Sequence, residues 1–76
     1  MDKVKLCKMM SIIEEEAKQK WQAMFKTIQY KWCKDILNKE PEDITYVDRE
    51  TLRNNLHALC LCVGLNYYNV ITRACQ

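Results

Sequence analysis

The residues with the most reactive side chains in this sequence are one histidine and two cysteines close together in the C-terminal half. His57, Cys60 and Cys62 fall within six positions. A thiol beside an imidazole can act as a nucleophile, and three such side chains can ligate zinc. In a regular helix, however, Cys60 and Cys62 point about 200° apart around the axis. We therefore expect no catalysis and no metal site here, with Cys60 as a small core residue and Cys62 on the opposite flank.

The wider inventory also argues against chemistry. The 76 residues include one glycine and one histidine, so no glycine-rich phosphate loop and no His-Glu-x-x-His motif is present. The five cysteines, an odd number, lack the density and paired spacing of a disulfide-stapled secreted domain. No apolar run reaches the roughly 18–20 residues that cross a bilayer. We expect a non-enzymatic protein without a cofactor, with reduced thiols, in an intracellular (cytoplasmic) location and without membrane contact.

Large apolar side chains form the second group that could carry function. An aromatic row at helical spacing is how a small helical bundle fills its core, and aromatic side chains with a charged rim also dominate the energy of protein interfaces. Lys20 and Lys31 lie beside this row on a helical wheel and would form such a rim or a solvated edge. The candidate interaction residues are Trp21, Phe25, Ile28 and Trp32 on one face, with Tyr30 and Leu37 on a second stripe.

These side chains are predicted to lie on one long helix over about 11–39. No glycine or proline occurs between Ser11 and Glu40, and Ser11 followed by Glu14 is a capping-box pattern. Such a helix is about 42 Å long, whereas a compact domain of this size is roughly 30 Å across. Part of it is expected to overhang. Because it has two apolar faces, we expect one to be covered by the rest of the chain and the other by an identical subunit or a partner.

Two shorter helices, over about 49–63 and 67–75, are predicted after an irregular segment at 38–47 with at most a short turn after the proline. Asp48 is the expected N-cap of the first, and Gly64 its left-handed C-cap. Asn66 can cap the second. The chain is therefore predicted to be a single small all-α domain, residues 1–76, that forms a dimeric helical bundle.

One further pattern concerns the junction of these two helices. Cys60 is a small residue, Gly64 follows four positions later, and Leu65 and the polar Asn66 come next, with Val70 six positions after the glycine. This pattern resembles the helix-turn-helix family. The resemblance implies that the second helix enters the DNA major groove, where its outward side chains read bases. The residues to which it assigns this role are Asn66, Tyr67, Asn69 and Arg73. A cap glycine is equally needed by any tight helical corner.

Charge alone does not indicate DNA or RNA as the ligand. Residues 1–40 carry nine lysines and six acidic residues, and residues 41–76 carry three arginines and four acidic residues. The pI near 8.3 lies below the value of about 9 that is typical of nucleic-acid binders. The Lys-, Asn-, Ile- and Tyr-rich composition is typical of a viral or phage accessory protein from an AT-rich genome. We therefore predict a homodimeric binding protein that occupies or inhibits a host protein, with a DNA-binding transcriptional regulator as the alternative.

Overall fold

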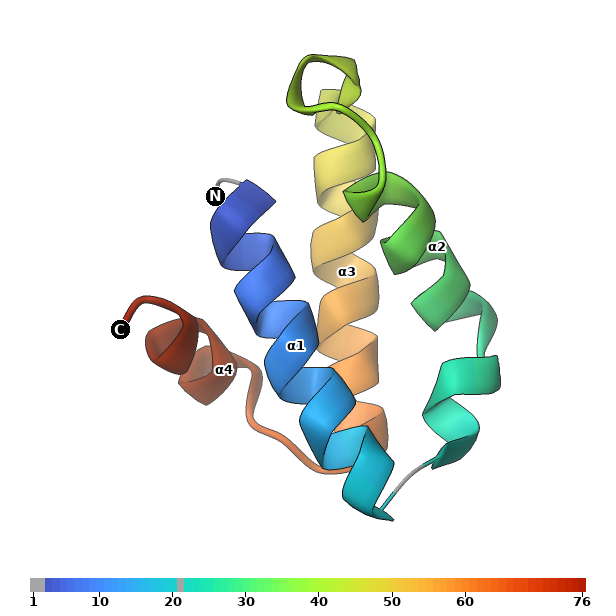
Figure 1. Cartoon of the computed structure of the whole chain (residues 1–76), viewed down its shortest axis with the longest axis vertical. Coiled ribbons are helices and arrows are strands. Elements are labelled where there is room, and N and C mark those ends of the chain that lie inside the picture. Colours follow the sequence, from blue (N-terminus) through green and yellow to red (C-terminus); the bar gives the residue numbers. More distant parts are fainter. Residues whose placement is uncertain (1–2, 21) are drawn as a thin grey trace.

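Four α-helices and two short 3₁₀ turns make up the computed structural model, which describes residues 3–20 and 22–76 (Figure 1). Within that part of the chain there is no strand, so the predicted all-α class is confirmed. The number of helices is four rather than three. The elements are α1 (Lys3–Lys20), η1 (Gln22–Lys26), α2 (Ile28–Leu37), η2 (Pro41–Asp43), α3 (Tyr46–Val63) and α4 (Tyr67–Ala74).

The predicted continuous helix over 11–39 is wrong. α1 ends at Lys20, the chain turns through η1, and α2 begins afresh at Ile28. Thr27 defines this second start, because its backbone is extended and its Oγ1 accepts a hydrogen bond from the Tyr30 N–H at 3.2 Å. Such a cap satisfies one of the N–H groups that every helix leaves unpaired in its first turn.

Packing explains why the predicted helix over 11–39 is interrupted, although no glycine or proline lies at the break. A helix of about 42 Å would exceed the whole molecule, whose Cα atoms extend over 34 × 28 × 16 Å. After the reversal, Met24, Cys33 and Leu37 are buried in the same core as Met9 and Ile13 of α1. Each square ångström of apolar surface removed from water stabilises the fold by about 25 cal/mol. That gain outweighs the preference of most η1 residues for a continuous helix, because helix propensities differ by less than about 1 kcal/mol per residue.

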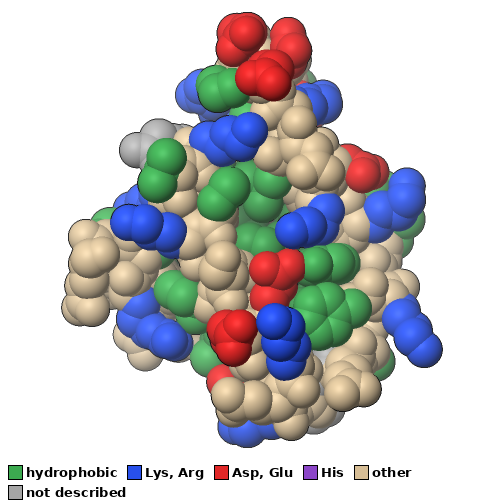
Figure 2. All heavy atoms as spheres, in the orientation of Figure 1, with side chains coloured by type: hydrophobic (Ala, Val, Ile, Leu, Met, Phe, Trp, Pro, Cys, Tyr) green, Lys and Arg blue, Asp and Glu red, His purple; other side chains and the backbone are tan. Residues whose placement is uncertain are grey.

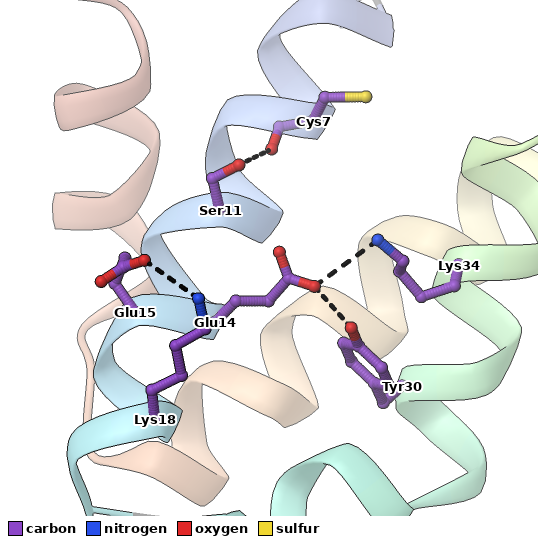
Figure 3. Close-up of polar contacts among 7 residues, drawn as sticks. All are labelled: Cys7, Ser11, Glu14, Glu15, Lys18, Tyr30 and Lys34. Carbon is purple, nitrogen blue, oxygen red and sulfur yellow. Dashed lines mark hydrogen bonds and ion pairs between the residues drawn. The ribbon is translucent and has the colours of Figure 1, made fainter.

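The start of α1 also differs from the prediction. The helix begins at Lys3, and Ser11 lies two turns inside it. The Ser11 Oγ donates to the carbonyl oxygen of Cys7 at 3.1 Å instead of capping a helix (Figure 3). The predicted capping box of Ser11 and Glu14 is therefore wrong. The helix extends towards the N-terminus because its buried side chains continue at helical spacing with Leu6, Met9 and Met10.

A capping box does form, but at α3. The Thr45 Oγ1 accepts from the Asp48 N–H at 3.0 Å, and the Asp48 carboxylate accepts from the Thr45 N–H at 3.2 Å. α3 therefore begins at Tyr46 rather than near residue 49, and Asp48 is its third residue rather than its N-cap. Hydrogen bonds from Lys39 and Thr45 hold the pKa of the Asp48 carboxyl below its ordinary value.

The corner between α3 and α4 agrees closely with the prediction from the sequence. Gly64 adopts the left-handed conformation with φ of 78°, and the Leu65 N–H donates to the Cys60 carbonyl at 2.8 Å. Asn66 caps α4 by accepting from the Asn69 N–H at 3.1 Å. Both predicted caps are confirmed, and α4 ends at Ala74, one residue before the predicted end.

The helices are arranged around α3. In Figure 1, α1 and α2 lie on either side of α3, and α4 packs on the other side of α1. All buried residues of the described chain are hydrophobic. The side chains with essentially no exposure include Met9, Met10, Ile13, Met24, Cys33, Leu52, Leu56, Leu59, Cys60, Val63 and Val70.

The Gly64 corner supplies a stability test. A Cβ built at Gly64 meets no atom within 4 Å, so Gly64→Ala adds no clash and reports only the cost of the left-handed backbone. We expect Gly64→Ala to lower the free energy of unfolding by about 1–2 kcal/mol. Gly64→Asn, the matched control, should lose less because asparagine tolerates this conformation. Urea unfolding measures both, and equal stability of Gly64→Ala and the wild type would contradict the assignment.

Candidate functional site

The six candidate interaction residues do not form one surface. Trp21 lies outside the described residues. Leu37 is buried against the core, and Phe25 and Tyr30 are half-buried, with their rings packed edge to face at 5.2 Å between centroids. The other two candidates point outward from α2: Ile28 is 48% exposed and Trp32 is 46% exposed.

Tyr30 belongs to a polar cluster that closes the seam between α1 and α2 (Figure 3). Its hydroxyl donates to Glu14 Oε2, and Lys34 Nζ lies 3.5 Å from the same oxygen. Burial and the hydrogen bond to the Glu14 carboxylate raise the pKa of Tyr30 to about 12. Tyr30 therefore serves the fold rather than an open surface, because its polar atom is already satisfied within the chain.

The outer face of α2 is the part of the predicted site that remains free. On a helix, Ile28 and Trp32 are one turn apart on the same side, and the buried Cys33 and Leu37 lie on the other. Beside Trp32 lies a hollow of about 320 Å³, lined by Trp32, Asp35, Ile36, Lys39 and Thr51. We call this area, Ile28 and Trp32 with the adjoining hollow, the α2 face.

Charges of both signs border the α2 face. Lys31 Nζ lies 3.6 Å from the Asp35 carboxylate, with both side chains largely exposed. Lys39 pairs with Asp48 at 2.7 Å. Such solvent-exposed pairs contribute little to stability. Their arrangement instead gives the rim of the α2 face a balanced charge.

The four residues proposed to read DNA are not equally available. The side chain of Asn66 is used as the α4 cap, and Tyr67 is half-buried, with its ring centroid 4.8 Å from that of His57 and the two rings tilted by 34°. Asn69 and Arg73 are exposed. The corner therefore directs two of the four candidates outward and uses the other two to build itself.

The three candidate residues for chemistry differ in burial: Cys60 is buried, whereas His57 and Cys62 are exposed. Cys60 is buried, and burial raises the pKa of its thiol to about 11, so it stays protonated at neutral pH. Cys62 is exposed on the opposite flank, as predicted. Among residues 3–20 and 22–76, no three His, Cys, Asp or Glu side chains gather closely enough to hold a metal ion. A thiol nucleophile needs a lowered pKa, and Cys60 has the reverse.

The sequence reasoning missed a second surface, on the N-terminal half of α1. Val4 is 65% exposed and Cys7 is exposed, on the side of α1 away from the core. The signal was available, since the buried spacing of Leu6 and Met10 extends the helical pattern of Ile13 towards the N-terminus. Because the helix was expected to start at residue 11, the residues before it were not placed on a face.

Two tyrosines allow a matched test of buried hydroxyl groups. Tyr30→Phe removes the hydrogen bond to Glu14 and should lower the free energy of unfolding by about 1–2 kcal/mol. The Tyr67 hydroxyl is buried without a hydrogen-bond partner among the described residues. Tyr67→Phe removes an unsatisfied polar group, so stability should stay unchanged or rise. Urea unfolding of both variants checks the opposite signs, and an equal loss in both would refute the assignment of Tyr30.

Buried thiols predict a loss of stability at alkaline pH. Burial raises the pKa of Cys33 to about 12 and that of Cys60 to about 11 from an ordinary 9.0. The folded state thus holds these protons more tightly, and the unfolded chain ionises first. Their contribution is complete below pH 9 and falls as the pH rises towards 11–12. Melting temperatures between pH 8 and 10 should drop less steeply in the Cys33→Ala/Cys60→Ala variant than in wild type; parallel curves would exclude these thiols.

Comparison with known proteins gives no relative from which a function could be inferred. No protein-family model, curated protein or solved structure matches this chain. Within the described part of the chain, no helix has the length and apolar character needed to span a membrane.

Proposed function

We propose that this chain is a binding protein without catalytic activity, which acts through protein–protein contact and pairs with a second copy of itself through the α2 face. The observation that carries the proposal is the exposure of Ile28 and Trp32, one turn apart on a helix whose other side is buried. Tryptophan is enriched among the residues that dominate interface energies. A large exposed aromatic side chain beside a hollow favours an interface over a solvated surface.

Charge symmetry supports a second copy as the occupant of the α2 face. In a dimer with a two-fold axis, each subunit contributes the same surface patch. Such a patch can pair with itself only if its own charges are complementary. Lys31 and Asp35 provide one charge of each sign on the rim. When two α2 helices meet antiparallel, each copy brings one Lys31 and one Asp35 to the rim, so the rim of the pair holds equal numbers of positive and negative charges. The interface then gains opposite charges at its edge around a centre of Ile28 and Trp32.

The remaining parts of the proposal rest on composition and chemistry. The Lys-, Asn-, Ile- and Tyr-rich composition supports a viral or phage accessory protein that occupies a host protein. The raised pKa of the Cys60 thiol supports the absence of thiol catalysis. DNA reading by the α3–α4 corner is the weaker candidate, because Asn66 and Tyr67 are engaged in the corner itself.

Sedimentation equilibrium tests the α2 face. We expect the wild type to dimerise and Trp32→Ala to raise the dissociation constant of the dimer at least tenfold, because loss of a central interface tryptophan costs about 2 kcal/mol or more. Leu61→Ala is the matched control: Leu61 is 72% exposed on α3, outside the α2 face, and its loss should leave the dimer intact. Circular dichroism confirms that both variants stay helical. A wild type that remains monomeric, or a Trp32→Ala dimer of unchanged affinity, would refute the proposal.

A further inference from the structure

A second surface lies between the N-terminal half of α1, the end of α4 and Pro41. It is a hollow of about 640 Å³. Its lining follows α1 from Lys3 to Ile12, nearly three turns or about 14 Å. The residues that line this α1–α4 hollow are Lys3, Val4, Cys7, Lys8, Ser11, Ile12, Pro41, Arg73 and Ala74.

The floor of the α1–α4 hollow is apolar. Val4 and Cys7 are exposed, Ile12 is half-buried, and Ala74 and Pro41 complete the lining. No polar group fills the centre of this lining except the Ser11 hydroxyl, and that hydroxyl already donates to the Cys7 carbonyl. An apolar floor of this length has the shape and chemistry that accept one side of a helix.

The rim of the hollow carries positive charge. Lys8 and Arg73 take part in no ion pair with the described residues, and the Lys3 ammonium group donates to the Lys39 carbonyl at 2.8 Å. None of the described lining residues is a carboxylate. Elsewhere on α1 and α2, four lysines are paired with carboxylates: Lys18, Lys20, Lys31 and Lys34. Lys8 and Arg73 are therefore available to pair with carboxylates of a partner.

Acidic side chains lie near one end of the α1–α4 hollow. On the face shown in Figure 2, Asp and Glu side chains gather at the tip between α2 and α3, over α2 and over the lower part of α1, and Lys and Arg side chains are spread over the same regions and over the left of the view. Glu40 and Glu42 flank Pro41 in the sequence, at one end of the hollow. Lys8 and Arg73 are the rim cations that have no ion pair with the described residues.

We propose that the α1–α4 hollow binds an amphipathic helix of a different protein, with aliphatic side chains on one face and Asp or Glu side chains along its flank. The aliphatic side chains cover Val4 and Ile12, and the carboxylates lie opposite Lys8 and Arg73. About ten residues of the partner helix, nearly three turns, match the length of the lining. This inference deepens the proposed function, since it names the chemical class of the partner.

Charge disfavours a symmetric second copy as the occupant. A two-fold pairing through this hollow would bring Lys3, Lys8 and Arg73 of both copies into one interface whose described lining offers no carboxylate. The apolar floor likewise disfavours DNA, because phosphates would meet the cations but leave Val4 and Ile12 facing a polar backbone. The α1–α4 hollow and the α2 face therefore suit different occupants.

The probe is a fluorescein-labelled 16-residue helical peptide with leucines at positions i, i+4, i+7 and i+11 and glutamates on both flanks. We expect saturable binding that weakens as salt rises, and at least a tenfold loss of affinity in the Lys8→Glu/Arg73→Glu variant. Lys26→Glu is the matched control, since Lys26 is an exposed cation outside the hollow and in no ion pair with the described residues. A peptide with lysines in place of the glutamates should not bind.

The exposed thiols give a second readout. Cys7 lines the hollow, whereas Cys62 is exposed on α3 outside it. Bound peptide should slow alkylation of Cys7 and leave the rate at Cys62 unchanged, as measured by mass spectrometry. Equal binding of the lysine peptide, unchanged affinity in Lys8→Glu/Arg73→Glu, or no protection of Cys7 would overturn the proposal.

Two further measurements separate this proposal from its alternatives. Tighter binding of a short DNA duplex than of the glutamate peptide, lost in Lys8→Glu/Arg73→Glu, would assign the hollow to nucleic acid and overturn the proposal. Peptide titration of Trp32→Ala should match the wild type, because Trp32 lies outside the hollow. If the wild type does not self-associate but binds the peptide, only the proposal for the α2 face is refuted. If it self-associates but does not bind the peptide, only the proposal for the α1–α4 hollow is refuted.

Discussion

The apolar side of α3 is the surface on which the other helices depend. Leu52, Leu56, Leu59 and Val63 recur at helical spacing and are all buried. A chain of 76 residues buries only a small core, so its apolar segments must converge on this one helix. α1 and α2 pack on either side of it, and α4 is added beside α1. The break after α1 follows from this requirement, because a straight helix could not bring both segments to α3.

The same break determines what remains exposed. α2 is short and one of its sides is committed to α3, so the opposite side, with Ile28 and Trp32, faces solvent. The seam between α1 and α2 is closed by Tyr30, Glu14 and Lys34, which satisfy one another. Aromatic side chains that are neighbours in the sequence thus have different roles. Phe25 and Tyr30 support the fold, and Trp32 is left available for contact.

The two exposed surfaces differ in charge symmetry, and this difference separates their proposed occupants. The α2 face carries the balanced pair of Lys31 and Asp35, which a two-fold axis can match. The α1–α4 hollow carries cations without carboxylates among its described lining residues, so a copy of itself would be repelled. The two proposals together assign self-pairing to one side of this small domain and an acidic partner helix to the other. Surface charge of this kind governs specificity more than it governs raw affinity.

The sequence by itself determined the all-α class, the Gly64 and Asn66 caps, and the burial of Cys60 against the exposure of Cys62, because each depends on local geometry or helical spacing. Only the tertiary structure decided that residues 11–39 do not form one rod and that Ser11 is not a cap, since propensity favours a helix through residues 22–26 and long-range burial overrides it. The same holds for the surfaces. The side of α2 that faces solvent depends on contacts between segments far apart in the chain, and so does the placement of Lys8 and Arg73 in the lining of one hollow.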